Sequence, residues 1–169
     1  MGNNELGQIL DTEATVLKLM KDSGFRYNRG TVPIEEMSQE NRFLASLSGR
    51  WPTIDEVRQY AMLHGGILCR MYAFAAVDLL RERGIPSTIL TLRDQTQPEK
   101  SLHVLVLYAG TRWLEPQTGK KGNFAQDGWG PFKEYYAKVC GFRPDGIVAA
   151  CELSSDPRQG RSLKSDKIL

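Results

Sequence analysis

The sequence predicts an α+β domain in which a helical N-terminal half packs on a small antiparallel sheet. Apolar residues from Glu5 to Lys21 recur mostly at the spacing of a helix. Between residues 87 and 115, short runs that favour strands are separated by turn signals. The 169 residues are enough for one domain that buries roughly 70% of its unfolded surface. We therefore expect a single domain over residues 1–153 and a disordered, polar tail over residues 154–169.

Glycines and prolines divide the N-terminal half into three predicted helices. The first runs from residue 5 to residue 21, and the second begins at Pro33 and ends near residue 47. Thr53 and Glu56 form a capping box, in which each side chain bonds the backbone N–H of the other residue. This pair predicts a third helix from residue 54 to about residue 63.

A fourth helix is predicted to begin near Cys69, because Gly65 and Gly66 allow the backbone to turn tightly just before it. Its interior is apolar on more than one face, so we expect it to be buried. Gly84 and Pro86 end it. The remaining elements are predicted as strands at 87–93, 102–109, 112–115 and 147–153, a short helix at 131–139, and polar loops at 94–100 and 118–130.

Cys69, His103 and Glu115 follow one another in an order that suits nucleophilic catalysis. A thiol at a helix N-terminus lies against unpaired N–H groups and the positive end of the helix dipole, which favours the nucleophilic thiolate. An imidazole on a facing strand can hold the proton and later deliver it to a leaving amine. Glu115, on the strand paired with that of His103, can accept the other ring N–H and orient the ring. The backbone N–H of Cys69 would then point at the developing oxyanion.

A longer pattern surrounds these three residues. It consists of Gly66, Cys69, Tyr72, Ala73, Leu79, Leu80, Gly84, Ile85, Pro86, His103, Val104, Trp113, Leu114, Glu115 and Pro116. The pattern resembles the transglutaminase-like superfamily, which includes eukaryotic transglutaminases, peptide N-glycanases and bacterial transglutaminase-like cysteine peptidases. The resemblance implies a papain-like core and a catalytic domain over residues 1–153, with Cys69 as nucleophile, His103 as base and Glu115 as third member. It covers about a third of the chain, and Glu115 replaces the aspartate that the family carries.

Three further residues are candidates for the edge of the site. Gln117 is the rival of Glu115 as orienter of the imidazole, since it lies two residues further along and on the same face if the strand continues. His64 either lines the cleft or complements the C-terminal end of the third helix. Trp51 matches an indole that helps to bind the oxyanion in transglutaminases proper, or it is an aromatic residue that packs ahead of the third helix.

Composition excludes several classes of protein. With 22 basic and 20 acidic side chains the formal charge is +2, too small to indicate a nucleic-acid partner. No apolar run approaches the roughly 18 residues that a membrane span needs, and no signal peptide is evident, so we expect a cytoplasmic protein. Non-classical secretion or injection into another cell stays open. Three cysteines without paired short spacing predict neither a metal site nor a disulfide framework, and no cofactor is expected.

Three functions are compatible with the sequence. The first is a cysteine hydrolase that cleaves an amide of a protein or peptide substrate through a thioester. The second is a glutamine deamidase or transamidase, which forms the same thioester but differs in acyl acceptor or substrate. The third is a non-catalytic binding module on a degenerate scaffold, which would have no chemical need to keep both Cys69 and His103. The sequence leaves the oligomeric state open.

Overall fold

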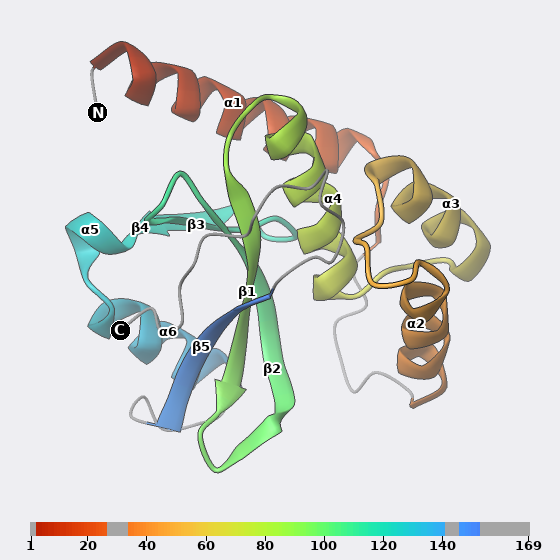
Figure 1. The fold of residues 1–169 in the computed structure, drawn as a ribbon. Coiled ribbons are helices and arrows are strands. Elements are labelled where there is room, and N and C mark those ends of the chain that lie inside the picture. The colour runs from red at the N-terminus through yellow and green to blue at the C-terminus, as the bar shows by residue number, and fades with distance from the viewer. Residues whose placement is uncertain (1–2, 27–33, 141–145, 153–169) are drawn as a thin grey trace.

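The chain combines helices with one antiparallel sheet, as the sequence predicts. The computed structural model describes residues 3–26, 34–140 and 146–152, and Figure 1 shows how the elements are arranged. The helices are α1 (Asn3–Asp22), α2 (Ile34–Ser46), α3 (Ile54–His64), α4 (Cys69–Glu82), α5 (Phe124–Asp127) and α6 (Gly130–Cys140). The strands are β1 (Ser87–Asp94), β2 (Gln97–Tyr108), β3 (Arg112–Glu115), β4 (Lys120–Asn123) and β5 (Ile147–Glu152).

Helix α3 begins and ends at the residues that its local sequence indicates. The capping box is present: the Thr53 side chain accepts from the Glu56 N–H, and Glu56 accepts from the Thr53 N–H at 2.8 Å. Gly65 takes a left-handed conformation with φ 72° and donates its N–H to the Ala61 carbonyl at 2.9 Å. The chain therefore leaves α3 at a defined residue and reaches α4 after a short connection.

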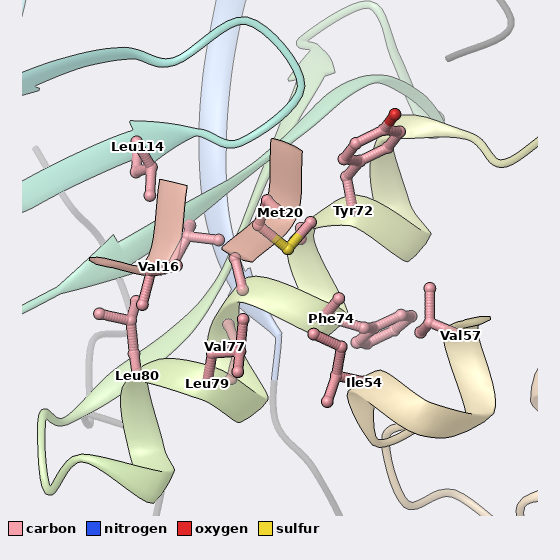
Figure 2. Packing of buried hydrophobic residues seen from close by; sticks show 14 of the residues in the cluster. Val16, Met20, Ile54, Val57, Tyr72, Phe74, Val77, Leu79, Leu80 and Leu114 are labelled. Carbon is pink, nitrogen blue, oxygen red and sulfur yellow. The ribbon is translucent and has the colours of Figure 1, made fainter. Parts of the chain in front are cut away.

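Helix α4 is the central helix of one layer and is buried through most of its length. Figure 2 shows Phe74 of this helix beside Ile54 and Val57 of α3, and these side chains share one buried cluster with Val16 and Met20 of α1. Full burial of a large apolar side chain contributes about 1.5–3 kcal/mol. The helix that carries Cys69 is thus fixed by its packing, as its apolar interior predicts.

The sheet has the strand order β4-β3-β2-β1-β5, and neighbouring strands are antiparallel. Alternate residues of β2 face opposite layers: Val104 and Val106 pack with α4, and Leu105 and Leu107 pack with Phe132 of α6. The sheet therefore lies between a layer of α1, α3 and α4 and a second layer of α5 and α6 (Figure 1).

Two predicted loops contain regular structure. Strand β2 begins at Gln97, inside the polar stretch 94–100, because the Asp94 carboxylate accepts from the N–H and hydroxyl of Thr96 and closes a tight turn. The stretch 118–130 contains β4 and α5. Gly122 of β4 pairs with Trp113, and a Cβ at this glycine would lie 2.6 Å from the indole nitrogen. The strand forms there because a residue without a side chain admits the indole ring.

Some predictions fall outside the described residues. The tail 154–169, the loop residues 27–32 and Pro33 at the start of the second helix belong to this group. Within the described residues, no helix is both long and apolar enough to cross a membrane.

Candidate active site

Cys69 is the first residue of α4, as predicted from the two glycines before it. Leu68, the residue at the helix N-cap, is extended and has no side-chain cap hydrogen bond. The connection before it is held by the Ile67 N–H, which donates to the Arg26 carbonyl at 3.0 Å. The sulfur therefore lies where backbone N–H groups of the first helical turn have no acceptor within the helix.

His103 lies on β2 at the point where the strand extends beyond its partner β3. The residues of β2 that pair with β3 run from Val106 to Tyr108, so His103 is outside this ladder. The ring is buried, and its Nε2 lies 2.6 Å from Oε1 of Glu115. Cys69 also forms a side-chain hydrogen bond with the His103 ring. Cys69, His103 and Glu115 are therefore brought together in the order expected from the sequence.

The surroundings of His103 favour its protonated form. Burial lowers the pKa of the ring, but the hydrogen bonds to Cys69 and Glu115 and the charges of these two groups raise it. The balance raises the pKa of His103 to about 9. The ring is therefore protonated on both nitrogens at neutral pH, and its Nε2–H group faces the Glu115 carboxylate.

Glu115 stays ionised despite its burial. Burial raises the pKa of this carboxyl, whereas hydrogen bonds from His103, Thr118 and Tyr136 lower it, and the net pKa is lowered. Thr118 donates its hydroxyl to Oε2 at 2.6 Å. The glutamate side chain thus reaches the position that an orienting carboxylate needs.

Gln117 also lies in the site, beside both His103 and Glu115. Its Nε2 lies 3.2 Å from Nε2 of His103 and 3.1 Å from Oε1 of Glu115. The ring nitrogen already donates to Glu115, so it cannot accept from the Gln117 amide. Gln117 therefore donates to the carboxylate and supports Glu115 in place of competing with it.

Trp51 and His64 lie in other surroundings. The Trp51 ring is 5.6 Å from that of Phe74, and the Arg81 guanidinium lies 4.8 Å from its centroid. These contacts place the indole against Phe74 and Arg81 of α4 and match the packing role. His64 ends α3, is exposed, and has its ring 4.3 Å from that of Tyr60.

Tyr136 of α6 is a site residue that sequence reasoning missed. Its side chain is buried and its ring centroid lies 5.5 Å from that of His103. The hydroxyl also supplies one of the hydrogen bonds that lower the pKa of Glu115. Tyr136 covers the side of the imidazole that faces the second helical layer. The sequence indicates only that Tyr136 is an aromatic residue on a short helix, so it gives no reason to place the residue in the site.

Glu40 of α2 is a second residue that sequence reasoning missed, and it lies close to the N-terminal end of α4. The carboxyl is buried and accepts a hydrogen bond from the Leu68 backbone N–H, one residue before Cys69. Burial raises its pKa to about 7, although this hydrogen bond and the charge of Arg70 act in the opposite direction. The Glu40 side chain of α2 thus supplies an acceptor at the N-terminal end of α4, because the Leu68 side chain cannot cap the helix.

Comparisons with family models, with curated proteins and with solved structures find no match for this chain. Among the described residues, no three His, Cys, Asp or Glu side chains form a group that could hold a metal ion. The arrangement of Cys69, His103 and Glu115 is therefore the main guide to function.

Proposed function

We propose that this chain is a cysteine-dependent amide hydrolase, a peptidase or amidase with a Cys-His-Glu triad. The observation that carries the proposal is that the buried His103 ring hydrogen-bonds both Cys69 and Glu115. A buried imidazole with these two partners is the arrangement that an activated thiol requires. The residue pattern that resembles the transglutaminase-like superfamily supports the same assignment and a papain-like core.

In the proposed reaction, the Cys69 sulfur attacks the carbonyl carbon of the substrate amide. The carbonyl oxygen becomes an oxyanion at the N-terminal end of α4, where the Cys69 N–H can donate to it. The imidazolium of His103 then gives its proton to the nitrogen of the leaving amine, the C–N bond breaks, and a thioester remains on Cys69.

Water completes the proposed reaction. His103, now neutral, takes a proton from the water molecule as its oxygen attacks the thioester carbon. The C–S bond breaks and the acid is released, while the sulfur and imidazolium return to their starting state. Glu115 keeps its negative charge throughout and stabilises the imidazolium at 2.6 Å.

Trapping the thioester tests this proposal. The full chain is mixed with a peptide digest of a cell lysate, quenched in acid and mapped by mass spectrometry. We expect an acyl group on Cys69 that hydroxylamine removes and that is absent from the Cys69→Ala and His103→Ala variants. Acylation spread equally over Cys69 and Cys151, or undiminished in His103→Ala, would contradict it.

The fate of the acyl group distinguishes hydrolysis from the related reactions. In water enriched in heavy oxygen, a hydrolase places the label in the new carboxyl group of a shortened peptide. A glutamine deamidase places it in a glutamate of an uncut peptide, and a transamidase joins the acyl group to an added amine without label. We expect the first result.

A further inference from the structure

The C-terminal end of α3 presents two large apolar side chains to solvent. Met62 is 86% exposed and Leu63 is 80% exposed, the largest values for large apolar residues in the described part of the chain. Single exposed apolar residues are common, but an adjacent pair beside hollowed surface is typical of interaction sites. Figure 1 shows α3 at the outer edge of the helical layer, away from α5 and α6.

A hollow lies on each side of this pair. The first has a volume of about 280 Å³ and is lined by Met62 together with Phe25, Arg26 and Arg58. The second has a volume of about 380 Å³, with Leu63 in its lining. The other residues that line the second hollow include Phe43, Tyr60, Arg42 and His64. Apolar side chains of a partner can therefore enter on either side of Met62 and Leu63.

The charge of this surface is positive. Arg26, Arg58 and Arg42 line the two hollows, and Glu56 is the acidic residue among the lining residues. Glu56 is neutralised by Arg50, whose guanidinium binds both of its carboxylate oxygens. Arg58 pairs with Asp55, but both side chains are well exposed, and such pairs compete poorly with a partner's carboxylates. Acidic groups therefore match this surface.

The surface continues towards the nucleophile. Gly65 and Gly66 line the first hollow, and Cys69 follows three residues after Gly66. Three extended residues span at most about 11 Å, so Cys69 lies within a few residues' reach of a peptide bound in this hollow.

We propose that Met62, Leu63 and the two hollows beside them form a docking surface for an acidic, apolar segment of a protein substrate. The identification of the partner as a substrate rests on the proposed hydrolase function, whereas its chemistry rests on the surface alone. The apolar side chains of the segment occupy the hollows, and its carboxylates meet the arginines.

Peptide binding to the full-length Cys69→Ala variant tests this surface without any turnover. The probe is a fluorescent decapeptide with leucines flanked by glutamates, and its matched control has lysines in place of the glutamates. We expect the acidic probe to bind at least about tenfold more tightly than the lysine probe. Its affinity should fall as the salt concentration is raised. Equal binding of the two probes, or no binding of the acidic probe at millimolar concentration, would overturn the proposal.

Surface variants locate the binding. The double substitution Met62→Ser with Leu63→Ser, made in the Cys69→Ala background, should lower the affinity for the acidic probe about tenfold. Val139→Ser is the matched control, since Val139 is an exposed apolar residue of α6, and it should leave binding unchanged. Binding that survives the double substitution would place the site elsewhere. Self-association that the double substitution abolishes would make the surface an interface between copies of this chain and would also overturn the proposal.

The double substitution in the otherwise wild-type chain separates this proposal from the hydrolase assignment. Alkylation of Cys69 by a small reagent should be unchanged, because Met62 and Leu63 do not belong to the triad. A chain that binds the acidic probe but has an unreactive Cys69 would refute the hydrolase and leave the docking surface standing.

Discussion

At the scale of single residues, the decisive feature is that His103 has two different partners. Its Nε2 faces the Glu115 carboxylate, and the ring also hydrogen-bonds the Cys69 side chain. Both partners favour the imidazolium, and burial from water strengthens each interaction. The protonation of this one ring therefore reports whether the triad is assembled.

We expect the His103 ring to titrate at about 9 in the wild-type protein, well above the ordinary value of 6.5. Because the pKa is raised by folding, the stability that it contributes is present below about pH 6.5 and is lost as the pH rises through about 9. NMR of the imidazole resonances measures the titration, and Cys69→Ala and Glu115→Gln should each lower the pKa. A His103 pKa near 6.5, or a pKa that neither substitution changes, would show that Cys69 and Glu115 do not act on the ring.

The roles of Glu115 and Gln117 predict unequal losses of activity. Glu115→Ala removes the acceptor of the ring proton and should lower kcat by about a hundredfold, with His103→Ala more damaging still. Gln117→Ala removes one donor to the carboxylate and should cost less than about tenfold. Steady-state kinetics with a substrate found by trapping gives the comparison. A larger loss in Gln117→Ala would make Gln117 the orienting residue.

At the scale of elements, the N-terminal end of α4 depends on a side chain from α2. Leu68 cannot cap the helix, and the buried Glu40 carboxyl accepts the Leu68 N–H instead. A carboxylate at a helix N-terminus is favoured by the helix dipole, but here burial opposes its charge more strongly. The Glu40 carboxyl thus holds the N-terminal end of α4, and its raised pKa makes this contact sensitive to pH.

Glu40→Gln should stabilise the protein at high pH while it keeps an oxygen that can accept from Leu68. Folding raises the pKa of Glu40 from 4.5 to about 7, so the wild-type chain loses stability as the pH rises through this window. We expect the variant and the wild type to match below about pH 4.5 and to differ by about 3 kcal/mol above pH 7. Urea unfolding across this range measures the difference. A constant difference at all pH values would mean that Glu40 does not titrate in the folded state.

At the scale of the whole molecule, the site lies where the helical layers and the sheet meet. Cys69 comes from α4, His103 from β2, and Glu115 from the end of β3, while Tyr136 reaches the ring from α6. The first helix is fastened to the same sheet by Glu13, which is fully buried and binds Tyr108, Arg112 and Lys121. The relative placement of the triad residues therefore depends on contacts far from the sulfur.

Glu13→Ala should be among the most destabilising single changes in the protein. It leaves the Tyr108 hydroxyl without its acceptor and the partially buried Arg112 without its carboxylate partner, and losing one member of a buried ion pair costs about 3–5 kcal/mol. Lys18→Ala removes the exposed pair with Asp22 and serves as control, with an expected change below about 0.5 kcal/mol. Thermal and urea unfolding measure both. Similar small effects for the two variants would show that Glu13 does not fasten α1.

The sequence predicted what local patterns encode. Paired glycines placed the start of α4 at Cys69, and a capping box placed α3. The early start of β2 was missed because its residues are polar and the Asp94 turn is encoded in side-chain hydrogen bonds. Tyr136 and Glu40 were missed for a different reason. Each acts through packing against an element distant in sequence, and no local pattern records such a partner.

Selective alkylation of Cys69 tests the central claim, which is that His103 activates this sulfur. The wild-type chain and His103→Ala are treated with limiting iodoacetamide at pH 6, and each cysteine is followed by mass spectrometry. Cys151 is an internal control, because burial raises the pKa of its thiol to about 11. We expect Cys69 to be labelled well before Cys140 and Cys151 in the wild type and to lose this advantage in His103→Ala. Equal labelling of the three cysteines, or a Cys69 that reacts as fast without His103, would contradict the account.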